Sequence, residues 1–208
     1  MSLDNHPEAL RAWRLAERKR LVAQRMALDA PTRAYAQTQF DQQLSALLAT
    51  HAGGVLGLCW PFRHEHDARH LASRWRARGG ISALPVVLAS GQPLQFRAWV
   101  PGDAMQLGVY DIPFPAHGTV VTPSVLLVPM NGFDAQGYRL GYGGGFFDRT
   151  LAALRAQGHT VCVIGVAFEF SRLTTIYPQH YDLPMDWIVT ETTTYAVRHQ
   201  CLVAQPAR

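Results

Sequence analysis

A cluster of glycines is the strongest chemical signal in this sequence. Four glycines lie between positions 141 and 145, with Arg139 before them and Asp148 after them. Glycine lets a ligand approach the backbone closely. A glycine loop that opens a helix offers free N–H groups and the positive end of the helix dipole to an anion. The segment therefore predicts phosphate binding, with a plain glycine-rich turn and an ordinary first-turn acid as the alternative.

The residues around the loop limit how phosphate could be held. Lys19 is the only lysine in the chain, and no GxxxxGK[ST] loop is present. Arginine forks, backbone amides and a metal ion must then supply the positive charge. Arg139 could add a fork, and Asp148 could hold Mg²⁺. The dinucleotide pattern GxGxxG is not met, because Phe146 stands where the third glycine should fall.

A basic helix is predicted near the start of the chain. Residues 7–28 have helical character, and Arg11, Arg14, Arg18 and Arg25 fall within roughly a 60° arc of one face. A solvated basic face and a face turned toward an anion are both compatible with this spacing.

Strands alternate with helices along the rest of the chain. This order predicts a three-layer α/β/α fold with a mostly parallel central sheet, Rossmann-like but not a dinucleotide-binding fold. We expect one domain over residues 1–208, with the basic helix packed on its core. The predicted strands are 55–60, 81–88, 94–100, 124–130, 161–168 and 187–190, and the predicted helices after the first are one beginning at Pro31, 67–78 and 146–157.

Composition excludes several classes of protein. The 208 residues are 48% hydrophobic with a net charge of +4, which suits a globular chain. No apolar run approaches the roughly 18 residues needed to cross a membrane. The N-terminus has no signal-peptide pattern, so we expect a cytoplasmic protein.

Cys59, Cys162 and Cys201 form no metal-ligand spacing, and buried inert thiols are expected at the first two.

The region around the glycine cluster resembles a known family. The stretch PMNGFDAQGYRLGYGGGFFDRTL, from Pro129 to Leu151, is similar to the signature of 5-formyltetrahydrofolate cyclo-ligases, also called methenyltetrahydrofolate synthetases. The fixed positions of that signature are matched by Phe133, Asp134, Gly137, Arg139, Leu140, Gly141, Gly143, Gly145 and Asp148.

The resemblance implies an enzyme that uses ATP and Mg²⁺ to cyclise 5-formyltetrahydrofolate. It implies catalytic roles for Arg139 and Asp148. A basic pair four residues apart on the first helix contacts ATP in the family, and Arg14 and Arg18 fit it. The implied ATP-binding residues are Arg14, Arg18, Arg139, Leu140, Gly141, Tyr142, Gly143, Gly144, Gly145, Phe146 and Phe147.

The resemblance also implies a folate side of the site. The segment WPFRHE, from Trp60 to Glu65, is similar to the family's W-P-x-x-x-E. Substrate contacts are thereby implied for Trp60, Glu65, Tyr142 and Phe146. Trp60 as a core aromatic and Glu65 as a surface acid beside an arginine are the alternatives.

A second acid is implied near the C-terminus. The segment PMDWIVTE resembles the family's D-x-[IV]-[IV]-T-E and implies that Asp186 joins Asp148 at Mg²⁺. A cap at the start of a strand is the alternative for Asp186. Two departures from the family stand out: Phe146 and Phe147 replace tyrosine, which removes a phenolic hydrogen bond but keeps the rings, and Ser171 replaces a glutamine.

Three other functions remain possible at this stage. One is a family member that binds folate or nucleotide without catalysis. Another is a different ATP-dependent kinase or ligase on the same architecture. An arginine-rich nucleic-acid binder is disfavoured, because the net charge is small and acids are interspersed. We therefore expect 5-formyltetrahydrofolate and ATP as partners, with no nucleic acid, no membrane and a monomeric state.

Overall fold

An eight-stranded sheet forms the centre of the computed structural model, which describes residues 6–51 and 53–206. Its strand order is β13-β12-β11-β9-β6-β1-β2-β3. The inner run from β2 to β11 is parallel, and the antiparallel pairings lie toward the two edges. The strands are β1 (Val55–Gly57), β2 (Ile81–Val86), β3 (Gln95–Ala98), β6 (Val125–Pro129), β9 (Cys162–Val166), β11 (Trp187–Val189), β12 (Thr194–Arg198) and β13 (Cys201–Ala204).

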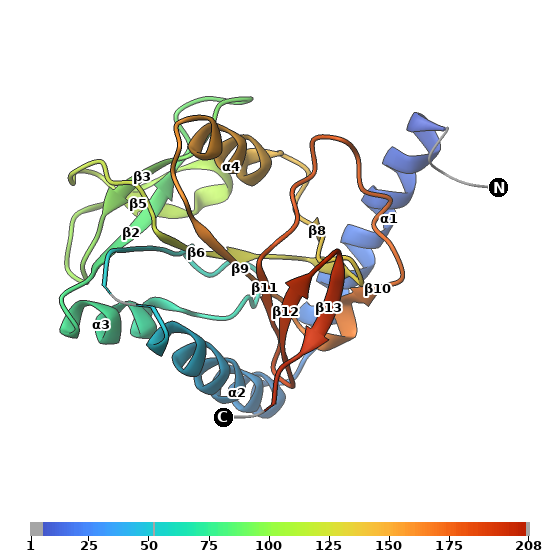
Figure 1. Ribbon diagram of the computed structural model, residues 1–208, viewed down its shortest axis with the longest axis horizontal. Coiled ribbons are helices and arrows are strands. Elements are labelled where there is room, and N and C mark those ends of the chain that lie inside the picture. Colours follow the sequence, from blue (N-terminus) through green and yellow to red (C-terminus); the bar gives the residue numbers. More distant parts are fainter. Residues whose placement is uncertain (1–5, 52, 207–208) are drawn as a thin grey trace.

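Helices cover both faces of this sheet. Figure 1 shows α4 (Phe146–Ala156) above the sheet, and α2 (Ala30–Ala49) and α3 (Arg69–Ala77) below it. Each face has its own apolar core, because strand side chains alternate between the two sides. Phe40, Leu44 and Trp75 fill the lower core, and Leu126 and Leu151 belong to the upper one. The predicted three-layer, mostly parallel fold is confirmed.

The helix α1 (Pro7–Met26) lies beside this three-layer body. Leu21 packs it against Leu140 and Ile176. A small sheet of β7 (Gly132–Asp134), β8 (Arg139–Leu140) and β10 (Arg172–Leu173) lies next to it. The helix ends at Met26, two residues before the predicted end, because Asp29 already caps α2 by accepting the Thr32 N–H at 2.7 Å.

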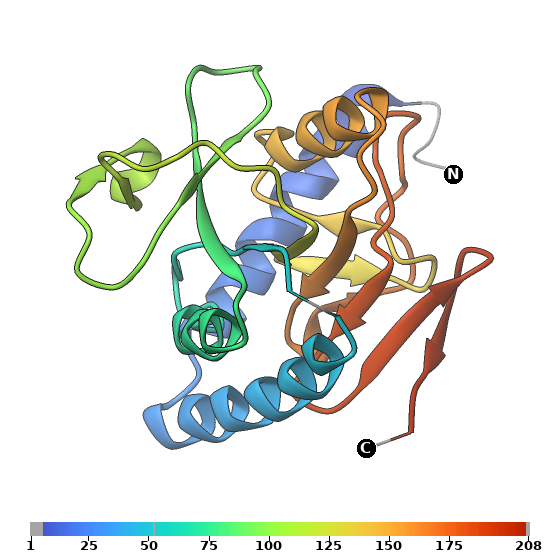
Figure 2. The same ribbon diagram turned by 60° about the vertical axis from the view of Figure 1, so that its left-hand side comes forward.

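A two-stranded arm forms a separate small sheet next to β2 and β3. It consists of β4 (Met105–Leu107) and β5 (Pro113–Pro115), joined by a short 3₁₀ turn, Val109–Asp111 (Figure 2). Tyr110 and Asp111 have φ values of 60° and 57°, which reverse the chain between the two strands. Neither strand is among those predicted from the sequence.

The C-terminal hairpin of β12 and β13 was also missed. Its turn residues His199 and Gln200 have φ values of 49° and 58°. These conformations are normally signalled by Asn-Gly or similar pairs, which this segment lacks. Several predicted strands are also shorter in the structure; the one predicted over 55–60 ends at Gly57. A further 3₁₀ turn, Glu169–Ser171, follows β9.

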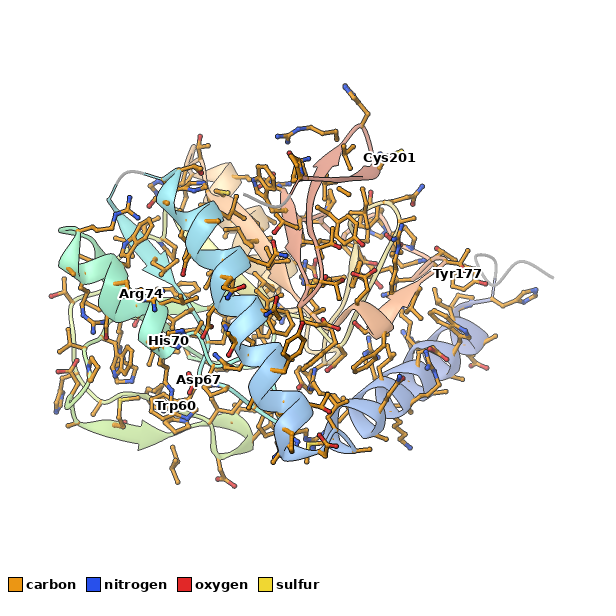
Figure 3. The ribbon with its side chains drawn as sticks, turned by 90° about the horizontal axis from the view of Figure 1, so that it is seen from below. Trp60, Asp67, His70, Arg74, Tyr177 and Cys201 are labelled. Carbon is orange, nitrogen blue, oxygen red and sulfur yellow. The ribbon has the colours of Figure 1, made fainter. Side chains whose placement is uncertain are left out.

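Polar contacts join α2 to α3 under the sheet. Arg74 donates to the Ser45 hydroxyl at 3.1 Å, and Gln37 bonds both the N–H and the C=O of Asp67 at 3.0 Å. Figure 3 shows Asp67 and Arg74 beside α2, with Trp60 close by. These contacts fix the segment before α3, which carries Glu65. Within the described residues, no helix is long and apolar enough to span a bilayer.

The lower core should carry much of the stability of the fold. Leu44 is fully buried between α2 and the sheet. We expect Leu44→Ala to lower the free energy of unfolding by about 2–5 kcal/mol, because it removes buried apolar surface and leaves a cavity. Leu15→Ala, at a position 52% exposed on α1, should change it by less than about 0.5 kcal/mol. Urea unfolding of both variants measures the difference, and equal effects would contradict this account of the core.

Candidate functional site

A cavity of about 980 Å³ opens at the carboxyl ends of β1, β2 and β6. Its walls come from α1, the arm, the glycine loop and a segment from Gln179 to Leu183. Ligands of open α/β sheets bind at this edge, outside the carboxyl ends of the strands. The predicted residues that line the cavity are Arg14, Arg18, Trp60, Glu65, Arg139, Leu140, Gly141, Tyr142, Gly143, Gly144, Gly145, Phe146, Phe147 and Asp148.

The glycine loop presents unused backbone amides. No amide from Tyr142 to Asp148 has an acceptor among the described residues. Gly143 and Gly145 have φ values of 96° and 65°, and Gly145 is the residue directly before α4. The last of these amides belong to the first turn of the helix, where N–H groups lack intrahelical partners. The loop therefore has the geometry of an anion cradle.

Arg18 lies directly against this loop. Its Nε donates to the Gly141 carbonyl at 2.7 Å. A methyl group on Gly143 would come within 3.2 Å of the Arg18 Cζ, so the glycine makes room for the guanidinium. Burial and the nearby Arg14 lower the pKa of Arg18. An anion bound at the loop would relieve the unfavourable burial of this charge.

Arg14 is held by the segment on the opposite wall. Its guanidinium donates to the carbonyls of Ile176 at 3.2 Å and Tyr177 at 2.7 Å, and pairs with Asp182 at 2.7 Å. Figure 3 shows Tyr177 beside the outer part of α1. Arg14 thus anchors this wall as well as facing the cavity. A fully solvated basic face on α1 is excluded, since Arg14 and Arg18 are partly buried and Arg25 is 4% exposed.

An ion pair closes the glycine loop at its base. Arg139 Nη2 lies 2.7 Å from Asp148 Oδ1, and both side chains are largely buried. The backbone of Leu183 joins them: its carbonyl accepts from Arg139 at 3.1 Å, and its N–H donates to Asp148 Oδ1 at 3.1 Å. Asp148 Oδ2 has no hydrogen-bond partner among the described residues. That oxygen is the one left available to a cation in the cavity.

The structure does not bring Asp186 to the cavity. It lies just before β11, and its carboxylate accepts the Val163 N–H at 2.8 Å. This contact corresponds to the strand-start cap considered as the alternative. No group of three or more metal-ligating side chains occurs in the described part of the chain. The paired arrangement of Asp148 and Asp186 is therefore not formed. Ser171 also lies outside the cavity lining, with its hydroxyl bonded to the Phe168 carbonyl at 2.6 Å.

A buried polar cluster lies beside the cavity, and its members Glu65 and Tyr142 line it. The Tyr142 hydroxyl donates to Glu65 Oε1 at 2.8 Å and accepts from Arg25 Nη2 at 2.8 Å. Glu65 Oε2 accepts the Phe62 N–H at 3.1 Å. Arg25 also donates to the Asn131 side chain at 3.3 Å. Glu65 is therefore a fixed, buried acid rather than the surface acid of the alternative.

Burial dominates the acid–base properties of this cluster. It raises the pKa of Glu65, although Arg25 and the Tyr142 hydroxyl oppose the rise. Arg25 Nη2 is 3.8 Å from the carboxylate and donates its hydrogen bonds to Asn131 and Tyr142. Its charge therefore offsets only part of the rise in the Glu65 pKa. Burial together with the nearby Glu65 charge also raises the pKa of Tyr142. The tyrosine therefore remains a hydroxyl donor.

Aromatic rings line the rest of the cavity. The Arg69 guanidinium lies 4.2 Å from the Trp60 ring centroid, and Trp60 packs partly against the lower core. Trp60 therefore packs against the core and also lines the cavity, while its contact with a substrate stays a prediction. Phe147 carries the Arg139 guanidinium at 5.9 Å, so this ring supports a cation and needs no hydroxyl to do so.

The thiols show no sign of activation. Burial raises the pKa of Cys162 to about 11 and raises that of Cys59 as well. A thiolate is the nucleophilic form of cysteine, so neither residue is suited to attack a substrate at neutral pH.

Sequence reasoning missed three parts of this site. Arg25 was placed on the basic face without a role, and Arg149 was not considered. The arm, whose Tyr110 ring stacks at 6.1 Å from Phe62, was also not foreseen. The helical spacing was the available signal for Arg25, and adjacency to Asp148 was the signal for Arg149.

Comparison with known proteins agrees with this geometry. The model of the 5-formyltetrahydrofolate cyclo-ligase family matches residues 10–191. The chain belongs to this family. Among curated cyclo-ligases, the one from Mycolicibacterium smegmatis is 35% identical over 121 residues, which is 55% of this chain and 56% of that protein. The cyclo-ligase of Haemophilus influenzae is 36% identical over 61 residues, 29% of this chain and 32% of that protein.

These matches span about a third to about half of the length of the curated cyclo-ligases. Solved structures extend the similarity over most of the chain. The 5,10-methenyltetrahydrofolate synthetase of Aquifex aeolicus has a TM-score of 0.74 at 25% identity, covering 89% of this chain and 93% of that one. The enzyme of the same name from Mycoplasma pneumoniae has a TM-score of 0.70 at 22% identity, covering 86% and 98%, which shows a shared fold.

The raised pKa of Glu65 leads to a pH-dependent stability. A carboxyl whose folded pKa is raised contributes stability that is complete below its unfolded pKa of about 4.3 and is lost as the pH rises through the folded value. Glutamine does not titrate. The melting temperature of Glu65→Gln minus that of wild type should therefore increase from about pH 4 to about pH 8.

Thermal unfolding at both pH values measures this difference. Glu8→Gln, at an exposed position in the first turn of α1, is the matched control. A difference for Glu65→Gln that stays constant or shrinks with rising pH would contradict the raised pKa.

Proposed function

We propose that this protein cyclises 5-formyltetrahydrofolate to 5,10-methenyltetrahydrofolate at the expense of ATP, releasing ADP and phosphate. One observation carries the proposal. A single cavity combines an anion cradle at the glycine loop with an apolar, aromatic end that contains a buried acid. Phosphoryl transfer to a folate needs both ends within reach of each other. Family membership supports the same reaction.

The reaction needs the formyl oxygen to become a leaving group. In the first step, the formyl oxygen bonds to the γ-phosphorus of ATP, and the bond from that phosphorus to the β–γ bridging oxygen breaks to release ADP. N10 then attacks the activated carbon, the C–O bond breaks with departure of phosphate, and the N10 proton is lost. The new C–N bond closes the five-membered ring of the methenyl cation.

The protein contributes charge neutralisation and positioning in this proposal. The free amides of residues 142–148 and Arg18 hold the phosphate chain of ATP. Arg14 keeps the opposite wall in place and faces the same space. Arg139 fixes Asp148, which holds the loop and the first turn of α4 in a constant position relative to each other. Nothing in this scheme requires a nucleophilic serine or cysteine.

Magnesium fits this site through one carboxylate oxygen. Asp148 lines the same cavity as the glycine loop and has no hydrogen-bond partner for Oδ2 among the described residues, whereas Asp186 lies outside the cavity lining. Mg²⁺ commonly binds through one or two carboxylates together with substrate phosphates and water. We propose that Asp148 is the protein ligand. The ion would neutralise charge on the phosphate oxygens.

The buried acid would serve the folate end. Glu65, Trp60 and Tyr142 line the cavity, and the Tyr142 hydroxyl holds the Glu65 carboxyl group in place. We propose that Glu65 accepts a hydrogen bond from the pterin or N10 side of the substrate.

Turnover by the purified protein tests the proposal directly. With Mg-ATP and 5-formyltetrahydrofolate, wild-type protein should generate the methenyl chromophore in the near ultraviolet. Absence of the chromophore with authentic substrate would refute the activity. Tight folate binding without ADP release would instead identify a non-catalytic member of the family.

Arg18 should act on the ATP end alone. We expect Arg18→Ala to raise the KM for ATP roughly tenfold, because it removes a charge-assisted contact to phosphate, and to change the KM for the folate much less. Steady-state kinetics with each substrate varied measure the two effects. Arg20→Ala, which removes an exposed arginine paired with Glu17 on the same helix, is the control. A larger rise in the KM for the folate than in the KM for ATP would contradict this role of Arg18.

A further inference from the structure

Arg149 lies against the glycine loop from the α4 side. It follows Asp148 in the first turn of α4, and its Nη2 donates to the Gly144 carbonyl at 2.5 Å. A methyl group on Gly145 would come within 2.7 Å of the Arg149 Nη1. Its guanidinium also lies 5.4 Å from the centroid of the Phe146 ring. The side chain is therefore folded back over the loop, at the rim of the cavity.

The hydrogen-bonding capacity of Arg149 is mostly unused. A guanidinium has five N–H donors. Gly144 takes one, and the Nε is buried without a partner. Within the described chain Arg149 has no carboxylate partner, whereas Arg14 pairs with Asp182 and Arg139 pairs with Asp148. A partly buried charge with vacant donors calls for an anion as its partner.

Arg149 and Arg18 flank the loop in a similar way. Each donates to a loop carbonyl, Gly141 for Arg18 and Gly144 for Arg149. Each also packs where a glycine leaves room, Gly143 for Arg18 and Gly145 for Arg149. The only lysine of the chain, Lys19, is exposed on α1 and does not line the cavity. Arginines must therefore supply the side-chain charge at the cradle.

We propose that Arg149 is a second arginine fork of the phosphate cradle and contacts the phosphate chain of ATP opposite Arg18. The inference rests on the proposed function, because it assigns a ligand contact within the same site. The Arg149 guanidinium lies near the Phe146 ring, and an aromatic ring can carry a guanidinium without a hydroxyl. Arg149 turns vacant donors toward the anion and keeps the loop carbonyl as an anchor.

Nucleotide affinity, measured by isothermal titration calorimetry, tests this role. We expect Arg149→Ala to weaken ATP binding roughly 10- to 100-fold, as expected for loss of a charge-assisted phosphate contact. Inorganic tripolyphosphate should lose affinity by a similar factor, since the contact is to phosphate. Arg149→Lys should recover part of the affinity, because it restores the charge without the fork.

Arg155→Ala, which removes an exposed arginine from the last turn of the same helix, should leave both affinities unchanged. Circular dichroism and thermal unfolding establish that each variant is folded. If Arg149→Ala binds both anions as wild type does, this inference is overturned while the proposed activity stands. Weakened ATP binding with unchanged tripolyphosphate binding would also overturn it. If wild type binds neither ATP nor tripolyphosphate, the inference fails together with the nucleotide site of the proposed function.

Discussion

The ion pair between Arg139 and Asp148 is the constraint on which the site depends. It joins the start of β8 to the first turn of α4, with the glycine loop between them. The Leu183 backbone bonds both partners, which ties the loop to the opposite wall of the cavity. Burying two charges costs desolvation, and these additional hydrogen bonds offset that cost. The loop can then leave its own amides unsatisfied, because its two ends are fixed by other groups.

Asp134, one of the fixed positions of the motif, does not line the cavity but supports the backbone around it. Asp134 is fully buried and accepts the N–H groups of Gln136, Tyr138 and Ile176. It therefore holds the β7–β8 turn and the start of the segment that bonds Arg14. Burial raises the pKa of this carboxyl, and the backbone donors counteract the rise. A residue can thus be fixed in a sequence signature because it shapes a wall, without touching a ligand.

The sequence predicted the layers and the glycine loop from local pattern, whereas the role of Glu65 was implied by the family resemblance and stays a prediction. Hydrophobic period and glycine spacing extend over a few residues, so they can be interpreted from the sequence without knowledge of distant contacts. The partners of Arg14 and Arg25 could not be predicted in this way. Arg14 bonds a segment more than 160 positions away, and Arg25 reaches a tyrosine 117 positions away. Asp186 shows that a local motif can also mislead. The motif suggested a metal ligand, but in the structure the Asp186 carboxylate caps a strand.

The position of α1 has a consequence for chain length. Arg18 bonds the glycine loop, and Arg25 bonds the Tyr142 hydroxyl beside the buried Glu65, both from this single helix. Seven residues separate them, which is about two turns and about 10 Å of helix rise. The helix therefore fixes the distance between the glycine loop and the cluster around Glu65. One inserted residue between them would turn Arg25 by about 100° relative to Arg18, so this stretch can vary in its outward side chains but not in its length.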